Sequence, residues 1–169
     1  MQRGLFVNDD RYCQRRKLIA IMNPKQIRII IVDDHQQVRE TWKLLLEQDK
    51  RFTIIAECSN GQEAIDAART LVPDIILMDI NMQPVNGLEA TRKIVVQTPT
   101  VGIIGMSINN QPAYARNMLQ LGAKGYVTKN SSKQEMTTAI MQVLSGKQYI
   151  CEEVRSKMPG SKDDKAPQS

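Results

Sequence analysis

The sequence predicts an α/β protein built on a doubly wound parallel sheet of five strands. Two observations predict this fold: five short runs rich in Ile and Val, and an amphipathic helical stretch after each run. Near-continuous apolar runs are typical of strands that are buried on both faces, as the strands of parallel sheets are. Helices that alternate with such strands cover both faces of the sheet. The chain of 169 residues is long enough to bury one sizeable core of this kind.

The expected strands and helices follow each other along the chain in strict alternation. The strands are expected at residues 27–32, 52–56, 75–78, 101–106 and 125–128. Helix starts are indicated by residues that cap or open a first turn, namely Ser59, Asn86, Pro112 and Ser132. Helix ends are indicated by residues that stop a helix or follow one, namely Pro73, Gly122 and Gly146.

The two ends of the chain show neither the apolar runs of the strands nor the pattern of an amphipathic helix. This sets the expected domain boundaries. Residues 1–24 are polar, carry five basic and two acidic side chains, and are expected to form a disordered or flexible flank. Met22 lies just before the first strand and is a candidate translation start. Residues 25–152 form the expected domain, and residues 153–169 have the composition of a flexible linker.

The composition argues against several classes of function. No run approaches the ~20 apolar residues of a membrane span, and no Gly-rich phosphate loop supports nucleotide binding. Cys13, Cys58 and Cys151 lack the spacing of a disulfide framework or a metal site, which favours the reducing cytoplasm. Most of the net charge of +5 lies in the N-terminal flank, so the body of the chain is not expected to bind nucleic acid.

Polar residues stand directly after four of the expected strands. They are Asp33 and Asp34 after the first strand, Asp79 after the third, Ser107 after the fourth and Lys129 after the fifth. The carboxyl ends of parallel strands meet at one edge of the sheet, where ligands bind in such folds. We therefore expect these five side chains to lie together and to form the functional site.

The chemistry of this group points to metal-assisted phosphoryl transfer. Three crowded carboxylates repel one another and need a proton or a cation. Mg²⁺ suits a site with few carboxylates and open positions for water and phosphate oxygens. A carboxylate can also act as a nucleophile toward phosphorus. In such a site Lys129 and Ser107 would bind the remaining phosphoryl oxygens.

The chain resembles the receiver domain of two-component response regulators, and among them the LuxR type. Five motifs in the expected order carry the resemblance: IVDDH at 31–35, LMDINM at 77–82, NGLEAT at 86–91, Ser107, and LGAKGYVTK at 121–129. The resemblance covers residues 25–150 and implies a flavodoxin-like (βα)₅ fold with strand order 2-1-3-4-5. It also implies a signalling phosphoacceptor rather than an enzyme.

The resemblance implies which residues form the acidic part of the site. Asp79 is similar to the phosphoacceptor, which receives its phosphoryl group from a sensor histidine kinase. Asp33 and Asp34 are similar to the acidic pair that holds Mg²⁺ together with the phosphoacceptor. Asn81 would contribute its backbone carbonyl to the metal.

Further residues and partners are implied in the same way. Ser107 and Lys129 are similar to the pair that binds the phosphoryl group, and Tyr126 is similar to the aromatic switch of the fifth strand. The LuxR resemblance implies a transcription regulator that contacts DNA through a helix-turn-helix output domain not contained in this chain. A homodimer is a candidate assembly.

Some residues allow two interpretations. Tyr126 is equally well explained as a half-buried packing residue on an edge strand. Ile108 follows Ser107 where a small residue is expected, and it is either a gate over Asp79 or a core residue against the next helix. His35 is interpreted as a packing or capping residue. The alternative to a phosphorylation switch is a stand-alone or phosphate-independent protein-interaction module.

Overall fold

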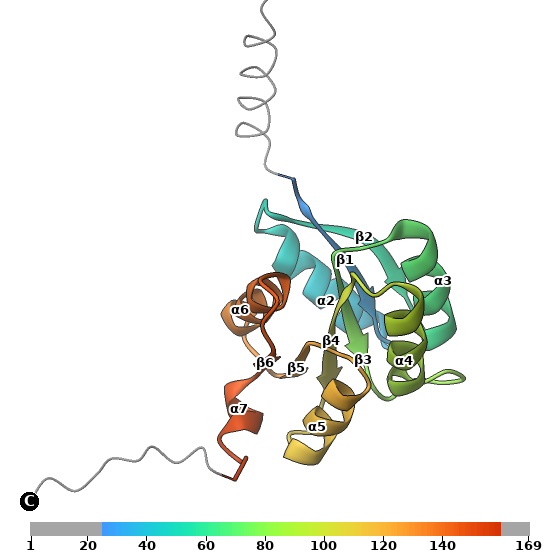
Figure 1. Ribbon diagram of the computed structural model, residues 1–169. Coiled ribbons are helices and arrows are strands. Elements are labelled where there is room, and N and C mark those ends of the chain that lie inside the picture. Colours follow the sequence, from blue (N-terminus) through green and yellow to red (C-terminus); the bar gives the residue numbers. More distant parts are fainter. Residues whose placement is uncertain (1–24, 160–169) are drawn as a thin grey trace, which may run out of the picture.

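A computed structural model describes residues 25–159 and shows a parallel sheet with helices on both faces (Figure 1). The strands are β1 (Ile27–Val32), β2 (Phe52–Cys58), β3 (Ile75–Asp79), β4 (Gly102–Ser107), β5 (Gly125–Thr128) and β6 (Tyr149–Ile150). The helices are α2 (Gln36–Glu47), α3 (Gly61–Leu71), α4 (Gly87–Gln97), α5 (Pro112–Gln120), α6 (Lys133–Leu144) and α7 (Glu152–Arg155). The strand order is β2-β1-β3-β4-β5-β6, so the predicted order of the five core strands is confirmed.

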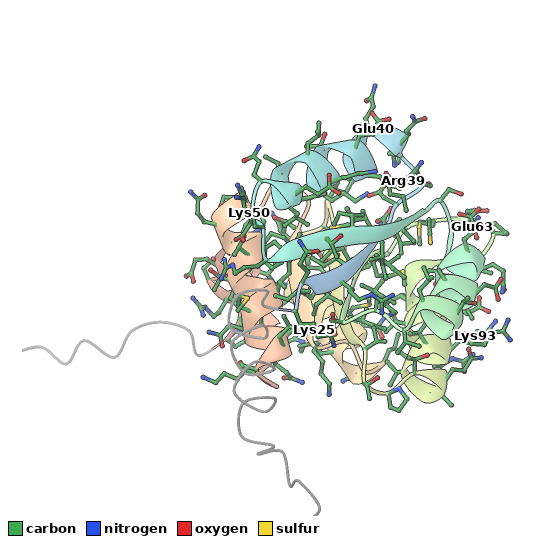
Figure 2. The ribbon with its side chains drawn as sticks, turned by 90° about the horizontal axis from the view of Figure 1, so that it is seen from above. Lys25, Arg39, Glu40, Lys50, Glu63 and Lys93 are labelled. Carbon is green, nitrogen blue, oxygen red and sulfur yellow. The ribbon has the colours of Figure 1, made fainter. Side chains whose placement is uncertain are left out.

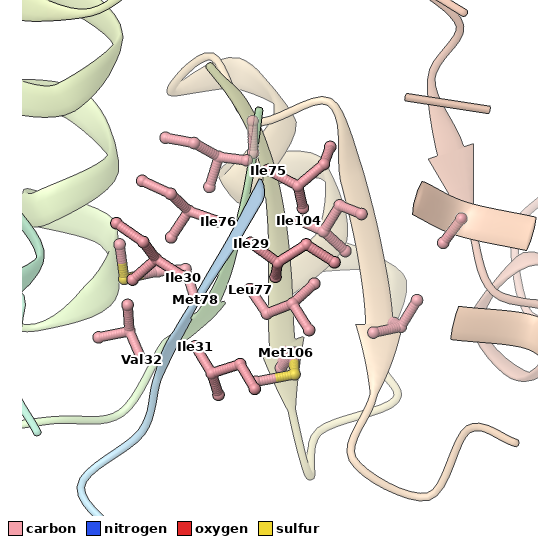
Figure 3. Packing of buried hydrophobic residues seen from close by; sticks show 14 of the residues in the cluster. Ile29, Ile30, Ile31, Val32, Ile75, Ile76, Leu77, Met78, Ile104 and Met106 are labelled. Atoms are coloured by element: carbon pink, nitrogen blue, oxygen red, sulfur yellow. The ribbon is translucent and has the colours of Figure 1, made fainter. Parts of the chain in front are cut away.

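The core lies between the central strands and the two helical layers. Helices α2 and α6 pack together over one face, and α3 and α4 pack together over the other (Figure 1). Figure 3 shows the aliphatic side chains of β1 and β3 pointing to both sides of the sheet, and Ile29, Ile76 and Leu77 are completely buried. Burial on both faces explains why these strands are near-continuous apolar runs. Charged side chains such as Glu40 and Lys50 lie at the periphery in Figure 2.

The helix caps agree with the sequence at two positions and differ at one. Asn86 Oδ1 accepts a hydrogen bond from the Glu89 amide at 2.9 Å, and Ser132 likewise caps α6. Ser59 is not the cap of α3, because Asn60 Oδ1 accepts hydrogen bonds from two amides of the first turn. Ser59 instead donates its own amide hydrogen to Glu63 at 2.7 Å. The Asn side chain is one position closer to the free amides of the first turn, so the predicted capping box is shifted by one residue.

Two short elements near the C-terminus were not predicted. Strand β6 pairs with β5 through Gly125 and Tyr126, so the sheet has six strands rather than five. Helix α7 follows it, and Val154 in α7 is completely buried. The structured domain therefore extends beyond the predicted boundary at residue 152. Segments of two and four residues are too short to show a periodic pattern, which explains why they were missed.

The predictions for the flank at 1–24, for Met22 and for Cys13 lie outside the described residues. Cys58 and Cys151 lie in the described part of the chain, where both are buried free thiols. Between residues 25 and 159, none of the helices has the length and apolar character needed to cross a bilayer.

Candidate functional site

The carboxyl ends of the central strands bring the predicted polar residues to one edge of the sheet. Asp33 directly follows β1, and Asp79 and Ser107 are the last residues of β3 and β4. All three side chains are buried, whereas the Asp34 side chain is 39% exposed. Strand β3 lies between β1 and β4, so Asp79 stands between the acidic pair and the hydroxyl.

Lys129 joins the two buried carboxylates. Its Nζ lies 2.7 Å from Asp33 Oδ2 and 3.0 Å from Asp79 Oδ2. Burial disfavours the charged form of Lys129, but the contacts with both carboxylates outweigh burial and raise its pKa. The pKa of Asp79 is also raised, first by burial and then by repulsion from Asp33, while Lys129 opposes the shift. One ammonium therefore faces an acidic pocket that it does not fully neutralise.

Backbone amides fix the orientation of the two buried carboxylates. The amide of His35 donates to Asp33 Oδ1 at 2.9 Å. The backbone of Asp33 is held as well, because the guanidinium of Arg39 donates to its carbonyl at 2.7 Å. The amide of Asn81 donates to Asp79 Oδ1 at 3.2 Å. Each carboxylate is thus held by an amide two residues later, which leaves its second oxygen toward Lys129. The proposed role of the Asn81 carbonyl as a metal ligand stays a prediction.

The oxygen donors of this pocket fit a hard divalent cation. Carboxylate oxygens of Asp33, Asp34 and Asp79 and one ring nitrogen of His35 all lie within 4.8 Å of one another. Small hard cations such as Mg²⁺ prefer carboxylate ligands and retain several waters, and the partly exposed Asp34 leaves one side of the group open to solvent. The three predicted carboxylates are therefore suitable Mg²⁺ ligands.

His35 is part of this group, which the sequence interpretation missed. Its side chain is 69% exposed, makes no capping hydrogen bond, and places Nδ1 2.7 Å from Asp34 Oδ1. It is therefore neither a packing residue nor a side-chain cap, although its backbone occupies the N-cap position of α2. Its place next to two aspartates, as the only histidine of the chain, was the available signal.

Tyr126 lies inside the molecule and contacts the loop after Ser107. Its ring is completely buried, because β6 pairs with β5 and so removes the edge that the sequence suggested. The hydroxyl donates to the Asn109 carbonyl at 2.6 Å, and Ser107 Oγ accepts from the Asn109 amide at 3.1 Å. Burial raises the pKa of Tyr126 to about 12, with a contact to Ser107 opposing the rise. The structure thus brings Tyr126 and Ser107 together, and the switching movement stays a prediction.

Ile108 is 75% exposed, so its interpretation as a core residue is wrong. Its position directly after Ser107 keeps the gate hypothesis as a prediction.

A groove of about 250 Å³ lies next to the pocket and shares Lys129 with it. Its apolar wall comes from α2, through Val38, Trp42 and Leu45. Trp42 is buried, with 4% of its surface exposed.

Fold and site together define a flavodoxin-like α/β domain with an acidic pocket at the carboxyl edge of its sheet. The chain belongs to the response regulator receiver domain family, whose pattern it matches over residues 29–141. Receiver domains bind Mg²⁺ at an acidic pocket, and the aspartates that follow β1 and end β3 form one here.

Similar proteins are response regulators. The chain is 37% identical over 129 residues to the transcriptional regulatory protein DegU of Brevibacillus brevis, covering 76% of this chain and 55% of DegU. It is 37% identical over 132 residues to the response regulator UvrY of Escherichia coli K12, covering 78% of this chain and 61% of UvrY. The chain therefore spans less than two thirds of these relatives.

A crystal structure of a LuxR-family two-component response regulator from Aurantimonas sp. SI85-9A1 is also similar. It superposes with a TM-score of 0.75 at 32% identity, covering 79% of this chain and 95% of that chain. The receiver domain of RcsB from Salmonella enterica, solved with the phosphomimetic BeF₃⁻, has a TM-score of 0.72 at 24% identity and supports the fold alone.

Proposed function

We propose that this domain is a phosphorylation-controlled switch in which Asp79 accepts a phosphoryl group from a sensor histidine kinase. The observation that carries the proposal is the position of Asp79 on β3, between the acidic pair after β1 and Ser107 on β4. Lys129 contacts Asp79 directly at 3.0 Å. The buried carboxylate of Asp79 thus has an ammonium group beside it and a hydroxyl on the adjacent strand. Two further carboxylates lie close enough to bind a metal ion with it.

The chemistry is the transfer of a phosphoryl group between two protein side chains. A carboxylate oxygen of Asp79 attacks phosphorus, the bond from phosphorus to the kinase histidine breaks, and the electron pair stays on the histidine nitrogen. Asp33, Asp34 and Asp79 would hold Mg²⁺, which would offset the charge of the phosphoryl oxygens and of the acceptor. Lys129 exchanges its contact with the free carboxylate for a contact with a phosphoryl oxygen, and Ser107 donates a hydrogen bond to another.

The groove beside the pocket is a suitable docking face for the phosphodonor domain. Its lining combines apolar side chains of α2 with Lys129, which contacts Asp79. A donor helix that packs on Val38, Trp42 and Leu45 would therefore bring its histidine near Asp79. Transcriptional output is proposed from the likeness to DegU, with DNA contacted by an output domain not contained in this chain.

A homodimer and a cytoplasmic location complete the proposal. The location is proposed because Cys58 and Cys151 are free thiols, as is usual in a reducing compartment.

The test is the intact mass after incubation with acetyl phosphate and Mg²⁺. We expect a hydroxylamine-labile gain of about 80 Da, the mass of one phosphoryl group. Asp79→Asn should lose the gain, whereas Asp66→Asn, an exposed carboxylate on α3, should keep it. Chelation of the metal should abolish labelling in the unaltered protein. If Asp79→Asn is still labelled, the assignment is wrong; if nothing is labelled, the phosphate-independent interaction module becomes the better interpretation.

A further inference from the structure

One carboxylate joins helix α7 to two segments next to the site. Glu153 Oε1 accepts a hydrogen bond from Asn110 Nδ2 at 2.5 Å, and Glu153 Oε2 accepts one from Thr128 Oγ1 at 2.9 Å. These two bonds, of which the one from Asn110 is the stronger influence, lower the pKa of the Glu153 carboxyl. The carboxylate therefore bridges the loop between β4 and α5 and the end of β5.

Both partners of this carboxylate are neighbours of the proposed phosphoryl-binding pair. Thr128 is buried and directly precedes Lys129. Asn110 lies three residues after Ser107, in a short loop whose Asn109 amide donates to the Ser107 hydroxyl. A movement of either phosphoryl-binding residue therefore acts on a group that holds the Glu153 side chain.

Helix α7 is also attached by packing and by backbone hydrogen bonds. Cys151 and Val154 are completely buried. The amide of Glu152 donates to Glu135 Oε1 at 2.9 Å, which ties the start of α7 to α6. The amide of Cys151, the N-cap residue of α7, donates to the Tyr126 carbonyl at 3.0 Å, and the bonds of Glu153 add side-chain links to the site beside this backbone link.

We infer that Glu153 is a positioning residue that favours the unphosphorylated arrangement, so that phosphorylation of Asp79 loosens helix α7. This inference rests on the proposed function. A phosphoryl group brings a charge of about −2 into the pocket and draws in Ser107 and Lys129. Glu153 holds the segments that carry these two residues through Asn110 and Thr128.

The coupling must act in both directions. If phosphorylation weakens the contacts of Glu153, then removal of those contacts favours the phosphorylated arrangement by the same factor. Glu153→Ala should therefore bind a phosphoryl mimic more tightly, on the order of fivefold, at the lower end of the usual couplings between sites.

The experiment uses the full chain with beryllofluoride and Mg²⁺ as the mimic. Hydrogen exchange is measured at the amides of Val154 and Arg155, which both bond to the Cys151 carbonyl, and mimic affinity is measured by titration. In the unaltered protein, the mimic should speed exchange at these amides. In Glu153→Ala, exchange should be fast without the mimic, and the mimic should add nothing further.

Two further variants separate a positioning role from a structural one. Glu152→Ala removes the same charge from the same helix, but its side chain pairs with Arg155 rather than with the site, so it should behave like the unaltered protein. Asn110→Ala removes the link from the loop side and should reproduce the effects of Glu153→Ala even if the latter folds poorly.

Each failure has its own meaning. If the mimic binds but exchange in α7 does not change, the inference is wrong and the proposed function stands. The same holds if Glu153→Ala and Asn110→Ala both bind the mimic with unchanged affinity. If the unaltered protein does not bind the mimic at all, the proposed function fails, and this inference fails with it.

Discussion

Replacing Lys129 by Met tests how the buried pocket balances its charge. Lys129 Nζ is within 3.0 Å of oxygens from both Asp33 and Asp79, and both carboxylates are almost completely buried. Met is similar in length and uncharged, so the variant leaves two buried carboxylates without the ammonium. Removal of one partner of a buried ion pair typically costs about 3–5 kcal/mol, and we expect a loss of that size in the free energy of unfolding at about pH 8 without Mg²⁺.

The pH dependence of this loss follows from the pKa of Asp79. Burial and Asp33 already raise this pKa, and the variant removes the opposing effect of Lys129, so the pKa should rise further. A folded-state pKa above the unfolded value means that the folded protein holds the proton more tightly. Stability is then greatest at low pH and falls as pH rises through the folded pKa. The loss in Lys129→Met should therefore be smallest at about pH 5 and largest at about pH 8.

Urea unfolding at these two pH values, with and without Mg²⁺, measures the effect. Because a cation that binds only the folded state stabilises it, Mg²⁺ should restore part of the stability of Lys129→Met at the higher pH. Lys124→Met, at an exposed position before β5, is the control and should change little under all conditions. An equal loss at both pH values, or no response to Mg²⁺, would refute the account of the pocket as a charge-balanced acidic cluster.

Two further predictions concern positions around the site. Gly87→Ala would place a Cβ against the backbone carbonyl of Asp79, which cannot move without shifting the end of β3, so urea unfolding should show a loss of about 3 kcal/mol. Gly146→Ala meets nothing nearby and should lose only the ~1–2 kcal/mol of left-handed strain. Ile108→Ala should change the free energy of unfolding by no more than about 0.5 kcal/mol, because the side chain is exposed. As a gate, Ile108 would also slow labelling by acetyl phosphate and loss of the label, so both rates should rise; unchanged rates would exclude the gate.

The sheet could be predicted from the sequence because its physical basis is local. Strands that are buried on both faces must be apolar throughout, and the alternation with amphipathic helices then allows few topologies. The first strand, 27–32, was predicted at its observed bounds for this reason. The cap of α3 was not, because Ser59 and Asn60 are both good capping residues and the choice depends on where the backbone turns.

The reacting groups of the site could be predicted for the same reason, because each stands at the end of a strand. The contacts that surround them could not, because they join residues far apart in the chain without any periodic pattern. Glu153 is 43 residues from Asn110 and 25 from Thr128. These residues meet because β6 pairs with β5 and turns α7 back toward the loop after β4. A two-residue strand that no sequence pattern reveals thus decides which acidic side chain of the C-terminal segment reaches the site.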